Sequence, residues 1–345
     1  MDHIDRTEAG AQSALLGLVS GFAVSRALYV VARLGLADLL AAGPRPCGEL
    51  AAATGTDPSA LLRIVRLLAT ADVLTLDREG RAGLTPVGAT LRSDAHPCLR
   101  GWVIGQLADY IVGAWGEVMH SVRTGGIAFD QAFGVDVWTY RARNEEAARD
   151  FDDAMVSFVA THDRAVVDTG VFARSGRIVD VGGGEGALLL AIVAAHAQAS
   201  GVVFDQPHVA RRAERRIASS PHGSRCSVAE GDAFKAVPSG GDTYVLSRVI
   251  HDWDDARALA ILRNCRHAMA PGARLVLIER VLPDRIEPGP RARLVAASDI
   301  QMMVMNGGRE RTESEYRALL ESGGFRFVRR LETGTLMEVL EGEAC

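Results

Sequence analysis

The feature that most constrains this chain is a change in sequence period near residue 177. From there on, apolar runs of strand length alternate with helical patterns. We expect strands at Arg177–Val181, Gly201–Asp205, Cys226–Gly231, Thr243–Ile250 and Arg274–Val281, with helices at Ala187–Ala197, Pro207–Ala218 and Asp254–Met269. This alternation predicts an α/β domain with a Rossmann-like, mainly parallel sheet covered on both faces. Two last runs, Phe325–Thr333 and Thr335–Leu340, predict an antiparallel hairpin at its end.

The first hundred residues have a different sequence pattern, which predicts short Ala- and Leu-rich helices separated by turn residues. Asp57 is placed to cap a helix, and residues 73–76 and 83–85 predict two strands around a polar turn. Three helices followed by a hairpin resemble a winged helix, so DNA binding has to be weighed. Between residues 44 and 91, however, five arginines face five acidic residues, whereas phosphate contacts require a basic surface. We therefore expect dimerisation or packing here, not nucleic-acid binding.

These differences in sequence pattern predict that the chain has three parts. We expect residues 1–100 to form the winged-helix-like, mainly α-helical dimerisation domain, and residues 169–345 to form the α/β domain. Between them, residues 101–168 predict long helices whose aromatic side chains fill a core or line a substrate cleft. A helix expected from Ala11 to Leu40 is apolar around too much of its circumference for a solvated surface. We therefore expect a homodimer formed mainly through the first part.

The composition indicates an ordinary globular protein. Apolar residues make up 48% of the chain, and the formal net charge is −5, which disfavours broad attraction to nucleic acid or anionic membranes. The five cysteines are scattered without a Cys-x-x-Cys pair, so neither a disulfide framework nor a zinc site is expected. No unbroken apolar run reaches the ~20 residues that span a bilayer, and the acidic N-terminus is unlike a secretory signal. We expect a cytoplasmic protein that does not bind a membrane.

The turn after the first expected strand is rich in glycine, in the sequence Asp180-Val-Gly-Gly-Gly-Glu-Gly186. Glycines allow a sharp turn and a close backbone approach to a ligand, and the following helix presents free N–H groups. The spacing Gly182-x-Gly184-x-x-Ala187 also fits a dinucleotide fingerprint, so an NAD-dependent oxidoreductase remains an alternative.

Acidic residues at the ends of the first three strands favour a different ligand. Asp205 ends the second strand, where its carboxylate can accept both ribose hydroxyls, and Asp232 ends the third, where it can bind an adenine amino group. Together with Asp180 they suit S-adenosylmethionine (SAM), which carries an amine, a ribose and an adenine but no phosphate. Each acid taken singly is also typical of a turn or a loop cap. All three at strand ends, where such sheets bind ligands, predict a SAM site.

One histidine and two glutamates are the candidates for chemistry. His251 follows the fourth strand, Glu279 ends the fifth, and Glu310 lies in the later loop before a helix capped by Thr312. Each also has a purely structural interpretation. His251 could be a hydrogen-bonded structural histidine or a surface residue, Glu279 part of an ion pair at the strand edge, and Glu310 a surface acid. Asp252, Asp254 and Asp255 crowd the loop after His251, but without further ligands they do not predict a metal site.

At these positions the chain resembles the SAM-dependent O-methyltransferases of the plant caffeate type and their bacterial secondary-metabolism relatives, particularly those that act on phenazines and anthracyclines. The matching segments are DVGGGEG (180–186), FDQPHV (204–209), GDAF (231–234), HDWDD (251–255) and GGRERT with the later ESGGF (307–325). The winged-helix-like front matches too, so the resemblance covers nearly the whole chain.

The resemblance implies a role for each matching position. His251 would be the general base, oriented by Glu279 and Glu310. The cofactor would contact Asp180, Gly182, Gly184, Asp205, Asp232, Ala233, Phe234, Ser247 and Trp253. Met155, Phe158, Asp252, Met302 and Asn306 would line the substrate pocket, with Met303 beside them. Where plant members have lysine, this chain has Ser247, which implies a hydroxyl hydrogen bond; at Ala233 the plant members have a larger side chain.

The expected reaction is transfer of the SAM methyl group to a hydroxyl on an aromatic small molecule. A phenol titrates near ~10 and a histidine near ~6.5, so histidine can accept the phenol proton as attack proceeds. The alternatives are N-methylation, a SAM-bound hydroxylase or decarboxylase, and a winged-helix regulator that binds DNA. The product would be S-adenosylhomocysteine (SAH), and no metal is expected.

Overall fold

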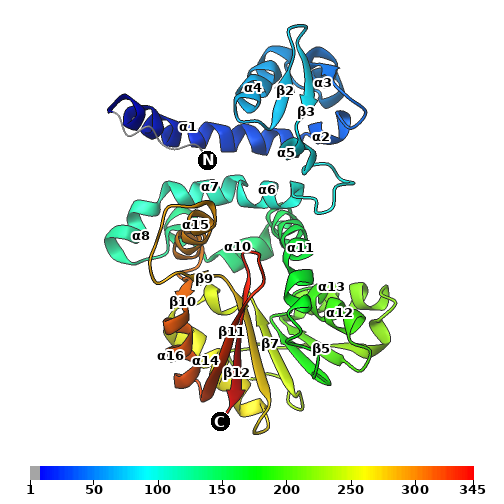
Figure 1. The fold of residues 1–345 in the computed structure, drawn as a ribbon, viewed down its shortest axis with the longest axis vertical. Coiled ribbons are helices and arrows are strands. Elements are labelled where there is room, and N and C mark those ends of the chain that lie inside the picture. Colours follow the sequence, from blue (N-terminus) through cyan, green and yellow to red (C-terminus); the bar gives the residue numbers. More distant parts are fainter. Residues whose placement is uncertain (1–7) are drawn as a thin grey trace. The chain divides into compact units, whose positions relative to one another are not determined.

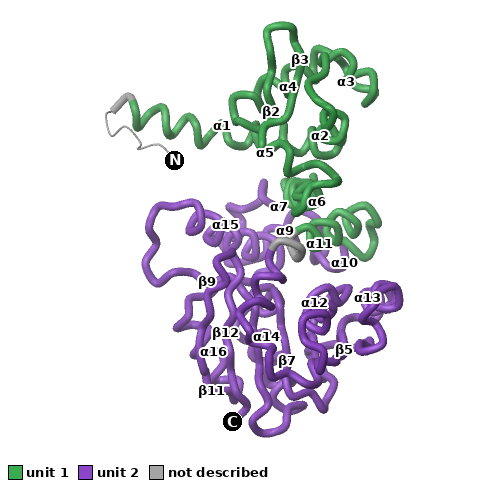
Figure 2. Tube along the Cα trace, turned by 45° about the vertical axis from the view of Figure 1, so that its right-hand side comes forward, with its two compact units in different colours: residues 1–112, 141–158 green, residues 113–140, 159–345 purple. Residues whose placement is uncertain are grey.

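The computed structural model describes residues 8–345, and their side chains except at residues 8, 9 and 158–161. The chain divides into two compact units (Figure 2). Unit 1 comprises residues 1–112 and 141–158, and unit 2 comprises residues 113–140 and 159–345. The domain boundaries expected at residues 100 and 168 stay predictions.

Unit 1 begins with α1 (Glu8–Arg33) and α2 (Leu36–Leu39). The single helix expected from Ala11 to Leu40 is therefore wrong, because Gly35 adopts a left-handed φ of 64° and breaks it. Further elements are β1 (Arg45–Pro46), α3 (Cys47–Thr54), α4 (Pro58–Thr70), β2 (Leu74–Leu76), β3 (Arg81–Leu84), α5 (Pro86–Ala89) and α6 (Arg100–Gln106). The carboxylate of Asp57 caps α4 as expected, accepting from the Ala60 N–H at 2.7 Å. The short strand β1 was missed; it pairs with β3 and makes the hairpin a three-stranded sheet.

The N-terminal part of α1 carries an exposed apolar surface. Leu15, Leu16, Leu18, Val19 and Phe22 are each between 64% and 70% exposed. By length and composition alone, Gly10–Arg33 is the one helix in the described part of the chain that could cross a membrane. This corrects the expectation that no apolar stretch is long enough: small residues interrupt the large apolar ones, yet the mean hydropathy stays high. One such helix is weak evidence for a membrane span.

Six helices occupy residues 100–168, and most are shorter than expected. They are α6, α7 (Asp109–Gly116), α8 (Val118–Thr124), α9 (Ala128–Phe133), α10 (Val137–Arg143) and the long α11 (Glu145–Asp168). Glycines explain several of the ends: Gly125 and Gly134 adopt left-handed conformations just after α8 and α9. In place of long helices, the chain turns repeatedly here, and only α11 has the expected length.

Unit 2 is built on a seven-stranded sheet in the order β11-β12-β8-β7-β4-β5-β6 (Figure 1). The strands are β4 (Arg177–Val181), β5 (Ser200–Asp205), β6 (Cys226–Glu230), β7 (Thr243–Ser247), β8 (Arg274–Glu279), β11 (Phe325–Glu332) and β12 (Glu338–Ala344). The first five of these run parallel to one another, and β12 pairs antiparallel with both β8 and β11. This confirms the expected mixed sheet with its hairpin. The chain reverses its winding between β4 and β7, which is where such sheets bind ligands.

Helices cover this sheet at the expected places. α12 (Ala187–Ala195) and α13 (Pro207–Ala218) pack against β5, while α14 (Asp255–Ala268) and α16 (Glu313–Ser322) pack together, with α16 against β11. Asp254 caps α14, and Thr312 with Glu315 forms a capping box on α16. The buried side chains of Tyr244, Leu262, Leu277 and Tyr316 belong to the core between strands and helices.

Two boundaries differ from expectation at points that shape the site. β7 ends at Ser247 instead of Ile250, because the chain turns into a short 3₁₀ helix, η2 (Ile250–Asp252). The expected strand Arg274–Val281 is split into β8 and a two-residue strand, β9 (Val281–Leu282), which pairs with β10 (Arg311–Thr312). The second hairpin strand begins at Glu338, three residues later than expected, after a wider turn. α15 (Pro290–Met305) follows β9.

Candidate active site

The glycine-rich turn after β4 requires glycine at two positions. Gly182 has a φ of 69°, and a Cβ there would lie 2.7 Å from Cγ2 of Val249. Gly186 has a φ of 80°, and its Cβ would lie 2.8 Å from Cγ2 of Val203. These approaches bring the turn against the end of β7 and start α12 directly over the sheet. The N–H of Gly184 donates to Oδ2 of Asp205 at 2.9 Å, so the turn is tied to the neighbouring strand.

The three strand-end acids lie along one edge of the sheet but differ in their surroundings. Asp205 is held by two backbone donors, Gly184 and Gln206 (2.7 Å), although its burial still raises its pKa. Asp232 is more open, with 44% of its side chain exposed, and accepts from the Phe234 N–H at 3.0 Å. Asp180 is 1% exposed, and neither of its carboxylate oxygens has a hydrogen-bond partner among the described residues.

Asp180 lies in an acidic surrounding. Burial, reinforced by the charge of Asp163 and opposed by that of Arg248, raises its pKa to about 7. Asp163, from α11, is itself buried; its pKa is raised to about 6 by burial, with the Arg248 guanidinium 3.7 Å away opposing the shift. Two buried carboxylates face one arginine here. A cationic group of a ligand would be stabilised in such a place.

Aromatic rings line the far end of this edge. Phe234 meets Trp253 edge to face, with ring centroids 4.8 Å apart, and Trp138 lies 6.5 Å from Trp253. The guanidinium of Arg257 covers the Trp253 ring at 4.6 Å. Asn264 donates to the carbonyl of Ala233 at 2.8 Å and holds the strand end beneath them. These half-buried rings offer an apolar surface beside Asp232, as a planar base requires.

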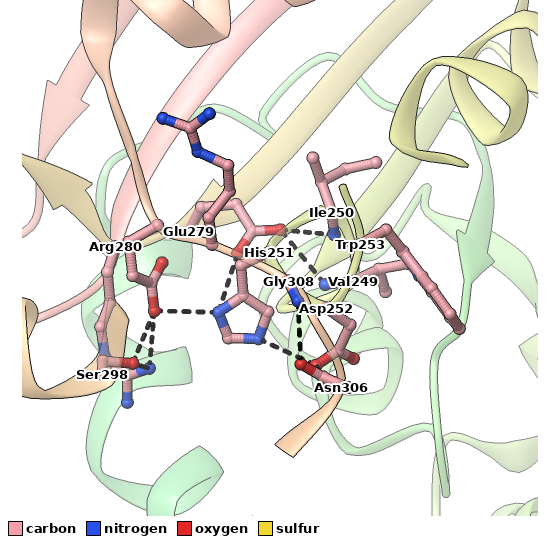
Figure 3. Close-up of polar contacts among 12 residues, drawn as sticks. Val249, Ile250, His251, Asp252, Trp253, Glu279, Arg280, Ser298, Asn306 and Gly308 are labelled. Carbon is pink, nitrogen blue, oxygen red and sulfur yellow. Dashed lines mark hydrogen bonds and ion pairs between the residues drawn. The ribbon is translucent and has the colours of Figure 1, made fainter. Parts of the chain in front are cut away.

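His251 and two glutamates meet at the end of β7 and β8 (Figure 3). His251 is 6% exposed, and its Nδ1 lies 3.0 Å from Oε1 of Glu310 and 3.7 Å from Oε2 of Glu279. Oε1 of Glu279 accepts from the backbone N–H groups of Val249 and Ile250 at 3.1 and 2.9 Å. The far ring nitrogen, Nε2, is left on the side of Asp252, whose Oδ1 is 3.8 Å away.

The charges of this group are strongly coupled. Burial alone would lower the pKa of His251, but the carboxylates of Glu310 and Glu279 outweigh it and raise that pKa to about 9. For Glu310 burial is outweighed by His251, Arg280 and Ser298, which lower its pKa to about 2. Burial prevails at Glu279 and raises its pKa to about 7. The protonated imidazole is therefore the resting form at neutral pH.

His251, Glu279 and Glu310 also offer ligand atoms within 4.8 Å of one another, which the sequence did not reveal. Oε1 of each glutamate is engaged: that of Glu310 contacts His251, Ser298 and Arg280, and that of Glu279 accepts from two backbone donors. Oε2 of each glutamate is buried and has no hydrogen-bond partner in the described part of the chain. The arrangement is that of a hydrogen-bonded triad, in which two carboxylates orient one imidazole.

The loop Asn306–Glu310 packs directly on the His251 backbone. A Cβ on Gly308 would lie 2.1 Å from the His251 carbonyl oxygen, which accepts from the Arg309 N–H at 2.9 Å. Asn306 donates through Nδ2 to Oδ1 of Asp252 at 2.8 Å. The buried Arg311 donates to the carbonyls of Ile250 and Trp253 and to Asp255. This arginine holds the turn that carries His251.

The structure brings most of the expected site residues together, but not all can be placed in it. Ser247 ends β7 with a buried hydroxyl that has no hydrogen-bond partner in the described part of the chain. Met302 and Met303 are half-buried on α15, close in sequence to Asn306. Met155 is half-buried on α11, in unit 1, and the side chain of Phe158 lies outside the described residues.

Sequence reasoning missed four polar side chains near these groups: Asp163, Arg248, Arg280 and Ser298. Asp163 and Ser298 lie on helices in which a polar residue is unremarkable. Arg248 has a φ of 58°, uncommon for arginine, which no local pattern predicts. Arg280 directly follows Glu279, and an arginine beside a buried glutamate was the one local clue.

Comparisons with known proteins identify the family of the chain. The family model described as the O-methyltransferase domain matches residues 115–326, and that of the O-methyltransferase dimerisation domain matches residues 16–94. The phenazine O-methyltransferase of Lysobacter antibioticus is 40% identical over 340 residues, covering 98% of each chain. The O-demethylpuromycin-O-methyltransferase of Streptomyces alboniger is 40% identical over 95% of this chain and 88% of its own.

Other relatives widen the range of chemistry. The phenazine-1-carboxylate N-methyltransferase of Pseudomonas aeruginosa is 37% identical over 93% of this chain and 94% of its own. Among solved structures, mitomycin 7-O-methyltransferase superposes with a TM-score of 0.90 at 34% identity, covering 98% of both chains. An O-methyltransferase from neocarzinostatin biosynthesis, solved with SAM and 2-hydroxy-5-methyl naphthoic acid, has a TM-score of 0.80 at 32% identity, covering 93% of this chain and 96% of its own. The chain described here therefore belongs to the O-methyltransferase family that carries an N-terminal dimerisation domain.

Proposed function

We propose that this protein transfers the methyl group of SAM to a hydroxyl on an aromatic small molecule in bacterial secondary metabolism. Family membership supports the reaction class, and the relatives named for phenazine and puromycin chemistry support the kind of acceptor. The observation that carries the proposal is the imidazole of His251, held at Nδ1 by Glu310 at the sheet edge where the glycine-rich turn ends. The NAD oxidoreductase and the DNA-binding regulator have no comparable support.

The residues along the sheet edge fit SAM. Asp180 has a buried carboxylate with unmet hydrogen-bonding capacity, suited to the cofactor amine, and Asp205 is fixed by backbone donors in position for a ribose. Asp232 beside the Phe234–Trp253 pair suits the adenine. Gly182, Gly184, Ala233 and Ser247 complete the expected contacts. When bound, SAM supplies a methyl group activated by the sulfonium.

In this proposal His251 acts as the general base through Nε2. Nε2 takes the proton from the acceptor hydroxyl as the hydroxyl oxygen attacks the methyl carbon, whose bond to sulfur would break to leave SAH. The positive charge that forms on the imidazole is stabilised by Glu310 and Glu279 at Nδ1. A base with a pKa of about 9 is close to a phenol near ~10, so the proton transfer is nearly balanced. Because the resting imidazole is protonated at neutral pH, turnover should rise with pH.

The acceptor is expected near Asp252 and Asn306. Asn306 orients the Asp252 carboxylate on the Nε2 side of His251, where it can accept a hydrogen bond from a second polar group of the acceptor. Met302, Met155 and Phe158 remain proposed apolar contacts by resemblance. A nitrogen acceptor is the second candidate, because a relative named as an N-methyltransferase is 37% identical. An aromatic ring nitrogen attacks with its lone pair and carries no proton, so its methylation would not need His251 as a general base.

Matched acceptors separate the two candidates. We would incubate the protein and labelled SAM with a set of fused aromatic acids that differ only in carrying a hydroxyl, an amino group, a ring nitrogen or a methoxy group. Label is expected on the hydroxylated members and absent from the methoxy members. Label confined to nitrogen would refute O-methylation, and no transfer despite SAH binding in calorimetry would refute the acceptor class.

We also propose that the protein works as a homodimer in the cytoplasm. The match to a dimerisation domain over residues 16–94 supports the homodimer, as does the exposed apolar surface on α1. Such a surface is typical of an interface. Light scattering should give twice the chain mass of 36.8 kDa, and Leu16→Gln with Phe22→Gln should shift the protein toward monomer. A wild-type monomer at working concentrations would refute the dimer.

A further inference from the structure

Behind the imidazole of His251 lies a second layer of polar groups (Figure 3). Oε1 of Glu310 contacts three partners: Nδ1 of His251 at 3.0 Å, the Ser298 hydroxyl at 2.6 Å and Nη1 of Arg280 at 3.3 Å. Arg280 Nη1 also donates to the Ser298 hydroxyl at 2.6 Å. These groups come from three segments: the end of β8, α15 and the loop before β10. Glu310 and Arg280 are buried, at 0% and 6% exposure.

The charges explain why this layer is needed. Glu310 and Glu279 are both fully buried beside the same imidazole, and two buried carboxylates cannot both stay ionised without a compensating cation. While His251 is protonated, it and Arg280 together balance both acids. A base must, however, be neutral before it accepts a proton. At that moment Arg280 is the cation that remains in contact with Glu310, and arginine does not deprotonate in proteins.

We propose that Arg280 and Ser298 are positioning residues for catalysis: they keep Glu310 ionised and directed at Nδ1 while His251 is neutral, so that Nε2 faces the acceptor with its lone pair. This inference rests on the proposed role of His251 as the base. It assigns no substrate contact to either residue. It predicts that the charge of Arg280, more than its shape, sets the pH at which His251 loses its proton.

Several other charged or titratable groups face this cluster and set the background for the test. They are Glu279 on β8, Asp252 in η2, Asp299 on α15, Tyr316 on α16 and Arg311 on β10. Asp299 accepts from the Glu310 N–H at 2.9 Å and so holds the Glu310 backbone from α15. None of these is altered in the variants below, so a shift of His251 reports on the changed residue.

The test is a direct titration of His251 in the full-length protein, with NMR of ¹³C-labelled histidine and the His251 signal assigned by its loss in His251→Gln. Arg280→Met removes a positive charge, which favours the protonated imidazole, so the midpoint should rise by about one pH unit or more. Arg280→Lys keeps the charge and should hold the midpoint close to wild type. Arg280→Gln, which keeps polar atoms but no charge, should behave like Arg280→Met and stands in for it if Met is not tolerated.

Activity then ties the shift to function. The rising limb of turnover against pH should move upward with the NMR midpoint, while SAH affinity by calorimetry stays the same. Ser298→Ala removes one hydroxyl behind the base and should lower turnover on a weakly acidic phenol about threefold to tenfold, in line with the net contribution of one ordinary hydrogen bond. An unmoved midpoint in folded Arg280→Met or Arg280→Gln, or unchanged turnover in Ser298→Ala, would overturn the inference. A moved midpoint with an unmoved activity limb would support the charge pairing and refute His251 as the base.

Discussion

Asp180 and Glu310 are equally buried acids in the same unit, yet they differ sharply in charge state. Asp180 is 1% exposed and Glu310 is 0% exposed. Burial, together with the charge of the nearby Asp163, raises the pKa of Asp180 to about 7. At Glu310 the contacts with His251, Arg280 and Ser298 overcome an equally complete burial and lower the pKa to about 2. The partner supplied by the chain, not burial, decides which acid is ionised.

Glu310 belongs to a site whose polar contacts come from the protein itself, whereas Asp180 belongs to a site whose polar contacts a bound ligand must supply. Oε1 of Glu310 has three partners within the chain, so its orientation toward His251 is built into the fold, although Oε2 has no hydrogen-bond partner among the described residues. Asp180 has none for its carboxylate oxygens among the described residues, which is costly unless a bound group supplies them. Each prediction below tests one side of this comparison.

The largest effect is expected at His251, in the site whose polar contacts come from the protein itself. His251→Ala should reduce turnover on a weakly acidic phenol by about a hundredfold to ten-thousandfold, because it removes the general base. SAH affinity should be unchanged. The wild-type rate should rise with pH toward the His251 pKa of about 9, and this limb should vanish in the variant. Steady-state kinetics from pH 6 to 9 measure both, with the exposed His267→Ala as the control that should behave like wild type. Wild-type turnover in His251→Ala would show that alignment alone drives transfer.

An effect of intermediate size is expected on cofactor affinity, at the site that a bound ligand would complete. Asp205→Ala should weaken SAM and SAH binding by about tenfold to a hundredfold, since a charge-assisted hydrogen bond is worth ~1.5–3 kcal/mol. Isothermal calorimetry measures it. The matched control is Glu230→Ala: Glu230 pairs with Asp205 across β5 and β6 but is exposed, so its loss should leave affinity unchanged. Equal affinities in Asp205→Ala and wild type would remove Asp205 from the cofactor site.

The smallest effects, in thermal stability without cofactor, should have opposite signs for the two acids. The pKa of Asp180 is raised in the fold, so its stabilising contribution is present below about pH 4 and is lost as the pH rises toward 7. Asp180→Asn should therefore melt higher than wild type at pH 8, and the gap should narrow as the pH falls. The pKa of Glu310 is lowered, so its contribution is present above about pH 4.5 and is lost toward pH 2. Glu310→Gln should melt lower than wild type at pH 8.

Calorimetric melting at pH 5 and 8 checks this pair of variants. Shifts of a few degrees are expected, given about 2–4 °C per kcal/mol for domains of this size. The exposed Glu332→Gln is the control for the amide substitution and should not move the transition. The same sign for Asp180→Asn and Glu310→Gln would mean that the two acids do not differ in the way described.

Local patterns alone predicted much of the fold. The alternation of period from residue 177 predicted every parallel strand of the seven-stranded sheet, and α13 occurs at the predicted residues Pro207–Ala218. Caps at Asp57 and Thr312 were readable because a cap involves atoms three residues apart. The glycine-rich turn and the strand-end acids were readable for a related reason: parallel strands place their carboxyl ends at one edge whatever the details of packing.

The tertiary structure determined which distant side chains meet and which of them are charged, neither of which follows from such short-range rules. The sequence suggested His251 and Glu310 by resemblance, but only the fold brings together side chains 59 positions apart at 3.0 Å. Arg280 and Ser298 carry no local pattern that points to Glu310, because their contact depends on where α15 packs relative to β8. The raised pKa of His251 and the divergence of Asp180 from Glu310 follow from such contacts. Backbone geometry repeats along a chain and can be read from it, whereas the charge on a buried side chain depends on partners that only folding supplies.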